Sequence, residues 1–384
     1  MDDTASPWRV TLADVSINDD DRRAVMEVLD SGWLSMGPVT ARFEDDLAAF
    51  LGTEHALAVT NGTAALHLAA AALGLGPGDE VICPSLTFVA SAAAMRQTGA
   101  TVRLADAVST DDFSLDPAEV TRLLTPRTKA IVVLHYGGYP APMDELVSLA
   151  REHGLLVIED ACHAPGARLD GASLGTIGDA GCFSFFPNKN MTTGEGGAVV
   201  FREKEHAERA RLLRSHAMTT LTWDRHRGHA TSYDVLDVGF NYRIDEIRAA
   251  LGVSQLARVP EFNRARKLLA DRYRERLAEH AGLHVPYEAA RGASSYHLAP
   301  VLARSLEARE ALREALRLER IQTSVHYPPI HRFTSYAGAG SLPVTDEIAD
   351  RVLTLPLHPG LTPETVDEVC DLLLHLVGAD GNLR

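Results

Sequence analysis

The chain has 384 residues, of which 46% are hydrophobic and 23% charged, which is the composition of a globular protein with an ample core. Its formal net charge of −15 at pH 7 argues against nucleic acid as the main partner. No stretch is long and apolar enough to span a bilayer, and the acidic start "MDDTASPW" is unlike a secretion signal. The four cysteines form no CxxC pair, so we expect reduced thiols in a cytoplasmic protein rather than a disulfide framework or a zinc site.

Apolar runs alternate with helical patterns over most of the first half of the chain. Helices are expected between most of the strands, for example over 63–76, 88–100 and 141–154. Asp116 followed by Pro117 is typical of a helix start. Strands separated by helices predict an α/β domain with a mostly parallel seven-stranded sheet covered by helices. The predicted strands are 55–59, 80–84, 101–106, 129–136, 155–160, 180–186 and 197–201.

The pattern changes after the last of these strands. Residues 243–280 form a long amphipathic helical pattern that is interrupted near Pro260, and a charged helix is predicted over 305–320. A terminal helix begins at Pro363. We predict a large domain with an N-terminal arm over residues 1–258 and a smaller α+β domain over residues 259–384.

The stretch "AVTNGTAAL" reads as a strand, a tight Asn-Gly turn and a helix that opens at Thr63. A helix N-terminus exposes N–H groups and partial positive charge, so it suits a phosphate. The stretch is neither a P-loop nor a GxGxxG fingerprint, which weakens a nucleotidase or dehydrogenase interpretation. An ordinary strand-to-helix turn remains the alternative.

In "LLVIEDACHAPGA", Glu159 and Asp160 directly follow an apolar strand. Ligands gather at the carboxyl ends of parallel strands, where a carboxylate can pair with a cationic ring nitrogen. A helix N-cap would give the same pattern. His163, three residues further on, is equally compatible with a core histidine.

Lys189 is one of only four lysines, and it lies between an aromatic strand and a glycine-rich turn in "CFSFFPNKNMTTGEGG". A dry surrounding disfavours the charged ammonium, so the neutral amine becomes available for Schiff-base chemistry. The Ser184 hydroxyl, on the preceding strand, can reach a phosphate. A phosphate seat, a carboxylate for a ring nitrogen and a lysine for an aldehyde are together what pyridoxal phosphate needs.

Blocks along nearly the whole chain resemble the DegT/StrS group of pyridoxal-phosphate-dependent sugar aminotransferases, which have the aspartate-aminotransferase fold type. They include "SGWLSMGPVTARFEDDLAAFLG", "NGTAALHLA", "GPGDEVICPSLTFVASA", "IEDACHAPGA", "FSFFPNKNMTTGEGG", "GFNYRIDEIRAALGVSQL", "HYPPIH" and "LPLHPGLT", in that order. The resemblance implies that Lys189 binds the cofactor aldehyde and moves protons, and that Asp160 pairs with the pyridine nitrogen. Related sugar dehydratases carry histidine at the lysine position, so Lys189 favours transamination.

The resemblance also implies the remaining cofactor contacts. Phe88 would stack on the ring, and His163 stands where many members carry glutamine near the ring oxygen. Asn241 would reach the phosphate bound by the neighbouring subunit, which implies a homodimer with shared sites. The phosphate would be held by the Ser184 hydroxyl and by the backbone of Thr63 and Ala64.

Two further stretches suggest contacts with substrate. The locally basic loop "TWDRHRGHATSYD" is expected either to meet a diphosphate or to be an ordinary solvated loop. Its histidines lack a nearby carboxylate-histidine helix, so no metal site is predicted. "SVHYPPIH" either lines the substrate mouth or only shapes the seam between domains. The substrate candidates in these stretches are Arg225, Arg227, His229, Tyr327 and His331.

The resulting hypothesis is an aminotransferase that moves an amino group from glutamate to a ketosugar, most simply one carried on a nucleotide diphosphate. One alternative is a transaminase for a free keto-cyclitol or ketosugar with glutamine as donor. Another is a non-catalytic regulatory protein that binds pyridoxal phosphate. The intact set of Lys189, Asp160 and Ser184 counts against the last.

Overall fold

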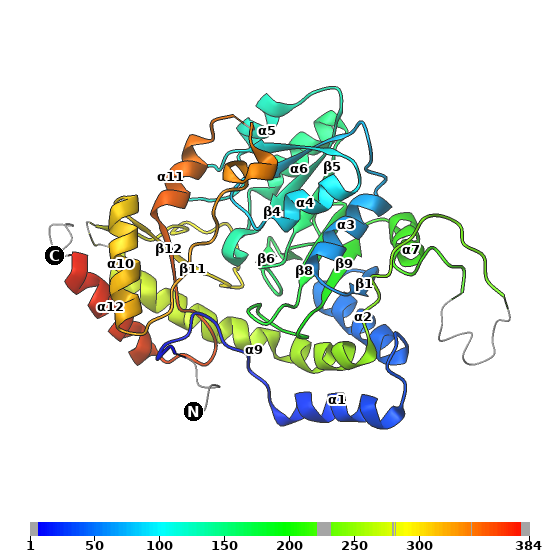
Figure 1. Ribbon diagram of the computed structural model, residues 1–384, viewed down its shortest axis with the longest axis horizontal. Helices are drawn as coiled ribbons and strands as arrows, with labels where there is room; N and C mark the ends of the chain where they lie inside the picture. Colours follow the sequence, from blue (N-terminus) through cyan, green and yellow to red (C-terminus); the bar gives the residue numbers. More distant parts are fainter. Residues whose placement is uncertain (1–6, 221–231, 279, 281, 339, 378–384) are drawn as a thin grey trace.

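The computed structural model describes residues 7–220, 232–278, 280, 282–338 and 340–377. A seven-stranded sheet lies among helices, and the C-terminal part of the chain builds a three-stranded sheet beside it (Figure 1). Among the described helices, none has the length and apolarity needed to cross a membrane.

The large sheet has the strand order β1-β9-β8-β5-β4-β2-β3. Only β9 runs antiparallel to its neighbours, and the other pairs are parallel. The predicted mostly parallel α/β sheet is confirmed, and each strand overlaps one predicted run. The strands are β1 (Ala56–Val59), β2 (Glu80–Pro84), β3 (Thr101–Ala105), β4 (Thr128–Leu134), β5 (Leu156–Asp160), β8 (Ala180–Ser184) and β9 (Gly197–Phe201).

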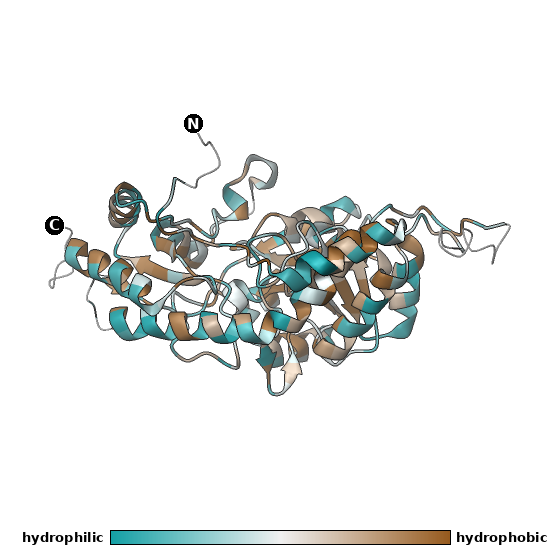
Figure 2. Ribbon diagram, turned by 90° about the horizontal axis from the view of Figure 1, so that it is seen from below, coloured by the Kyte–Doolittle hydropathy of each residue, from teal (hydrophilic) through white to brown (hydrophobic). Residues whose placement is uncertain are grey.

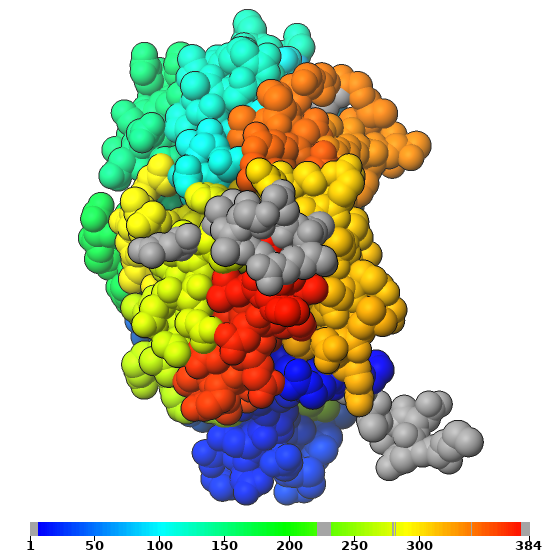
Figure 3. Space-filling view, turned by 90° about the vertical axis from the view of Figure 1, so that its left-hand side faces the viewer, coloured from blue at the N-terminus to red at the C-terminus, as the bar shows by residue number. Residues whose placement is uncertain are grey.

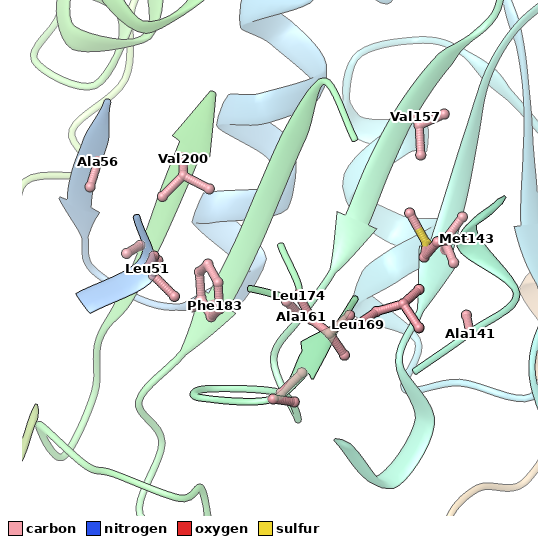
Figure 4. Packing of buried hydrophobic residues seen from close by; sticks show 14 of the residues in the cluster. Leu51, Ala56, Ala141, Met143, Val157, Ala161, Leu169, Leu174, Phe183 and Val200 are labelled. Atoms are coloured by element: carbon pink, nitrogen blue, oxygen red, sulfur yellow. The ribbon is translucent and has the colours of Figure 1, made fainter. Parts of the chain in front are cut away.

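Helices cover both faces of this sheet. Successive side chains of a strand point to opposite faces, so each strand contributes apolar side chains to two cores. In β4, Ala130 and Val132 belong to a core shared with α3 (Gly62–Ala72), α4 (Ala90–Gln97) and α7 (Lys204–Leu213). Ile131 and Val133 belong to the opposite core, shared with α2 (Pro38–Leu51) and α6 (Met143–His153). Figure 4 shows part of this second core, with Phe183, Val157 and Met143 along the same side of the strands. Figure 2 shows the apolar strands enclosed by helices with hydrophilic outer faces.

Helix α5 (Pro117–Leu123) confirms the predicted start, since Asp116 accepts the Ala118 N–H at 2.9 Å and Pro117 occupies the first turn. The predicted interruption near Pro260 is wrong, because α9 (Glu246–Leu277) runs through it without a break. A proline removes one helical hydrogen bond, but packing against α1 (Asp19–Ser31), α2 and α12 (Pro363–Val377) holds α9 on both sides of Pro260. The boundary between residues 258 and 259 falls inside this helix and stays a prediction.

The C-terminal part is built on an antiparallel sheet that shares a core with α9, α10 (Leu306–Leu318) and α12. Figure 3 shows the N-terminal segment, in blue, against this part. Backbone hydrogen bonds join them; for example, Gln322 N–H donates to the Val10 carbonyl at 2.9 Å, and Leu357 N–H to the Leu12 carbonyl at 3.1 Å. The other described strands and α-helices are β6 (Arg168–Leu169), β7 (Ala172–Ser173), β10 (Leu283–His284), β11 (Ala299–Ala303), β12 (Val352–Leu355), α10 (Leu306–Leu318) and α11 (Pro343–Arg351).

Candidate active site

A cavity of about 670 Å³ opens at the carboxyl edge of the large sheet. Strands β1, β5 and β8 point the same way, since β8 is parallel to β5 and β9 is antiparallel to both β1 and β8. Their carboxyl ends therefore meet at one edge, where ligands of α/β sheets gather. Eight of the residues singled out from the sequence line this cavity: Thr63, Ala64, Phe88, Asp160, His163, Ser184, Lys189 and Tyr327.

One end of the cavity combines the N-terminus of α3 with the end of β8. Asn61 caps the helix, with its Oδ1 accepting the Ala64 N–H at 2.8 Å. Gly62 brings the helix against the strand: a Cβ at Gly62 would lie only 2.8 Å from the Ser184 Cβ and 3.3 Å from its Oγ. A side chain at position 62 would fill this space. The end of the cavity thus pairs a hydroxyl with a helix N-terminus, an arrangement that suits a phosphate.

Asp160 supplies the carboxylate on the adjacent strand. It is 4% exposed, and its Oδ2 accepts the Ser91 hydroxyl at 2.6 Å. Its Oδ1 accepts the Cys162 N–H at 3.2 Å. These two bonds hold the carboxylate at the cavity wall.

Lys189 lies in a turn in which its N–H donates to the Phe186 carbonyl at 2.9 Å. Its side chain is partly buried and faces the same cavity as Asp160. Burial lowers the pKa of Lys189, while Cys162 and Asp160 oppose that shift. The net lowering increases the share of neutral amine, which is the nucleophilic form.

His163 and Tyr327 form a hydrogen-bonded pair at the cavity wall. The Gly137 N–H donates to His163 Nδ1 at 3.3 Å, and burial lowers the His163 pKa well below its ordinary value. The neutral ring therefore carries its hydrogen on Nε2 and donates it to the Tyr327 oxygen, 2.9 Å away. Burial also raises the Tyr327 pKa well above its ordinary value, so the phenol keeps its own hydrogen to donate.

Glu159 points away from the cavity and is fully buried. Its carboxylate accepts the N–H groups of Gly175, Ile177 and Gly178 at 2.6–2.7 Å, and His135 Nε2 at 2.9 Å. Of the two adjacent carboxylates, only Asp160 thus lines the cavity. Glu159 fixes the loop between β7 and β8.

The other candidates lie elsewhere. His331 is bonded to Ser85 Oγ at 2.7 Å and to Asp346 Oδ1 at 3.0 Å, and it does not line the cavity. Asn241 is exposed and forms an isolated antiparallel bridge with Ser215. Arg225, Arg227 and His229 lie outside the described residues. Within the described ranges, no group of three or more histidine, cysteine or acidic residues is placed to hold a metal ion.

The cavity also contains residues that the sequence analysis did not select. Cys162 lies between Asp160 and His163, and Tyr242 follows Asn241. Both belong to motifs that carry the family resemblance, so their place in the sequence could have indicated that they line the cavity. Tyr242 is bonded to His67, with its hydroxyl 2.8 Å from Nδ1. Other unselected residues of the lining include Asn61, Gln97, Phe186, Asn188, Glu195 and His326.

Comparisons with known proteins identify the family of the chain. The profile of the DegT/DnrJ/EryC1/StrS aminotransferase family matches residues 15–374. The GDP-perosamine synthase of Caulobacter vibrioides is 39% identical over 368 residues, covering 94% of this chain and 96% of the relative. The dTDP-3-amino-3,4,6-trideoxy-alpha-D-glucose transaminase of Streptomyces venezuelae is 41% identical over 344 residues, covering 88% and 87%. The crystal structure of the aminotransferase TlmJ of Streptoalloteichus hindustanus superposes with a TM-score of 0.89 at 36% identity, covering 95% of this chain and 97% of that one.

Proposed function

Because this chain belongs to the DegT/DnrJ/EryC1/StrS aminotransferase family, we propose that it moves an amino group from glutamate to a ketosugar carried on a nucleoside diphosphate, using pyridoxal phosphate. The protein is an aminotransferase, and aminotransferases of this family depend on pyridoxal phosphate. The observation that carries the proposal is the convergence of Lys189, Asp160 and Ser184 on one cavity.

Apart from Lys189, the residues of the cavity fit the cofactor at two points. Ser184 and the α3 N-terminus suit its phosphate, and the close approach at Gly62 leaves no room for a side chain there. The Ala64 N–H already donates to Asn61, so a bound phosphate would share or replace that acceptor. Asp160, held by the Ser91 hydroxyl, offers a negative charge to a ring nitrogen.

Bound pyridoxal phosphate supplies an aldehyde that bonds amines and a ring that accepts electrons. In this site the neutral amine of Lys189 would hold the aldehyde end of the cofactor, and the same amine would move a proton at the substrate carbon. Asp160 would keep the ring nitrogen protonated. The Tyr327 hydroxyl, which accepts from His163, presents its own hydrogen to the reactants. Phe88, 57% exposed at the mouth, offers a face for stacking.

The substrate class is supported by the relatives and by charge. Both curated relatives are named for GDP- or dTDP-linked sugars. No arginine is among the described residues that line the cavity, although glutamate and a diphosphate both bring negative charge. Cations from outside the cavity are therefore needed. We assign this role to Arg225, Arg227 and His229 of the basic loop, of this subunit or its partner.

A shared dimer site follows from the same reasoning. Asn241 is exposed and does not line the cavity of its own chain. The segment before it carries the exposed apolar side chains Val235, Leu236 and Val238, and Val238 is 84% exposed. Apolar side chains in such a row are typical of an interface. We propose a two-fold homodimer in which Asn241 reaches the phosphate bound by its partner.

Two experiments test these proposals. A yellow protein should bleach when glutamate is added, and a panel of nucleotide ketosugars should then show one aminated product by mass spectrometry. Bleaching by glutamine with turnover of free cyclitols would support the first alternative, and a yellow protein that no donor bleaches would support the regulatory one. For the dimer, Lys189→Ala and Asn241→Ala chains, each impaired as a pure dimer, should regain partial activity after subunit exchange, since one mixed site carries neither change. Verified heterodimers without recovery would contradict the shared site.

A further inference from the structure

The turn that carries Lys189 is closed at its base within its own segment. The Phe185 N–H donates to the Gly196 carbonyl, and the Thr193 N–H donates to the Phe185 carbonyl, both at 2.9 Å. Within residues 186–192 of this turn, the side chain of Asn190 makes the hydrogen bonds that reach distant segments of the described chain. The residue next to Lys189 is thus the anchor of the turn.

Asn190 is 2% exposed, and its amide group is bonded on both sides. Nδ2 donates to Asn263 Oδ1 on α9 and to the Ser295 carbonyl, each at 2.7 Å. A carbonyl only accepts, so the Ser295 bond fixes which end of the amide carries nitrogen. Asn190 Oδ1 therefore faces His297 Nδ1 at 3.0 Å, and His297 must be the donor of that bond.

His297 lies in the segment before β11 and is 4% exposed. Burial lowers its pKa well below the ordinary value, so the neutral ring has a single hydrogen, which the bond to Asn190 places on Nδ1. Its backbone N–H donates to the Gly137 carbonyl at 2.8 Å. Its ring also packs on the ring of His163, with centroids 4.5 Å apart.

We propose that His297 is a positioning residue of the aminotransferase: its Nδ1–H holds Asn190 and thereby Lys189, while its ring holds His163. His297 does not line the cavity and acts only through these two neighbours. The inference rests on the proposed role of Lys189. It deepens that role by linking the amine to a side chain of the C-terminal part of the chain.

The link matters because proton transfer needs the amine within about 0.5 Å of its working position. A misplacement of about 1 Å can cost roughly a hundredfold in rate. Without the Nδ1–H donor, Asn190 Oδ1 loses its bond and the turn has one anchor fewer. Lys189 then gains freedom and access to water.

Two substitutions separate the two contacts of His297. His297→Phe keeps a flat ring against His163 but removes the donor. His297→Asn keeps an N–H near the Nδ1 position but removes the ring. Asn190→Ala breaks the same link from the other side, and it keeps the test available if His297→Phe does not fold.

The first readout uses cofactor-free protein. Competitive acetylation across a pH series, read by mass spectrometry, gives the pKa of each lysine, and Lys129, Lys204 and Lys267 serve as internal references. We expect His297→Phe and Asn190→Ala to raise the Lys189 pKa toward the ordinary value of about 10.4, and His297→Asn to leave it lowered. The second readout is turnover. In His297→Phe, kcat should fall about ten- to a hundredfold with KM within about twofold. His297→Asn, which keeps the donor, should recover the part of kcat that depends on Asn190, and the loss that remains measures the ring contact with His163.

His358→Phe is the matched control, because His358 is another buried histidine and its ring bonds Thr11 at 3.3 Å near the N-terminus. It should lower the melting temperature without changing the Lys189 titration. The proposal is overturned if His297→Phe behaves like this control, or if the effects of His297→Phe and Asn190→Ala on kcat simply add. The acetylation series needs no sugar substrate, so a wrong substrate assignment would leave its outcome intact.

Discussion

Replacing Glu159 by glutamine should destabilise the protein strongly, although no atom of Glu159 lines the cavity. One carboxylate oxygen accepts the N–H groups of Ile177 and Gly178, and the other accepts Gly175 N–H and His135 Nε2. A glutamine has one accepting oxygen, so its NH₂ group must face two of these donors. His135 cannot change its hydrogen without loss, because its Nδ1 already accepts the Ala141 N–H at 3.2 Å.

The magnitude follows from the two orphaned donors. A buried donor without a partner costs about 1–3 kcal/mol, so two cost about 2–6 kcal/mol. Because glutamine is neutral, the variant avoids the cost of burying a charge, and this offsets part of the destabilisation. We expect a net loss of about 2–4 kcal/mol from an unfolding free energy of about 5–15 kcal/mol. The assay is guanidinium unfolding of cofactor-free protein, followed by circular dichroism. Glu145→Gln, at an exposed position of α6, is the control and should change stability by less than about 0.5 kcal/mol. Equal midpoints for the two variants would refute this reasoning.

Three further predictions concern the site itself. Borohydride should attach the cofactor to Lys189, and Lys189→Ala should not turn over; an adduct mapped to another lysine would contradict the assignment. Asp160→Asn should slow transamination at least about ten- to a hundredfold, the equivalent of a charge-assisted bond of about 1.5–3 kcal/mol, and a parent-like rate would reduce Asp160 to a local cap. Acid should destabilise the protein, because burial lowers the pKa of His163, His297 and His326, the last to about 4. Below about pH 6.5 the unfolded chain then binds more protons than the folded one, so the unfolding free energy should fall as the pH drops toward 4, in a urea titration at stepped pH.

The large sheet was predictable because each of its strands is a short apolar run separated from the next by a helical pattern. Parallel strands place their carboxyl ends together, so the sequence places Asp160 and Ser184 at one edge of the sheet. The period of two in a strand also separates Glu159 from Asp160, since neighbouring side chains of β5 point to opposite faces. What the pattern did not indicate is which of the two would face the cavity.

Side-chain pairs between distant positions had no signal in the sequence. Ser91 bonds Asp160 across 69 positions, and Tyr327 bonds His163 across 164. No spacing rule connects such positions, because they meet only after β2, β4 and β5 have assembled and the C-terminal part has docked. At Pro260 the sequence does carry a local signal, and it predicts a break in the helix. Packing along the whole of α9 overrides this local propensity.

Helix α9 makes hydrogen bonds to three parts of the chain that are far apart in the sequence. In its first half, Gln255 donates to Asp21 Oδ2 on α1 at 2.8 Å. In its middle, Asn263 accepts from Asn190 beside Lys189. One turn later, the buried Arg266 donates to the Leu357 carbonyl at 2.7 Å in the C-terminal part. One helix thus bonds the N-terminal part, the lysine turn and the C-terminal part, so a movement of the C-terminal part against the large sheet would strain the anchor of Lys189. Pro260 lies between the first and second of these contacts, where the missing backbone bond makes the helix easiest to bend.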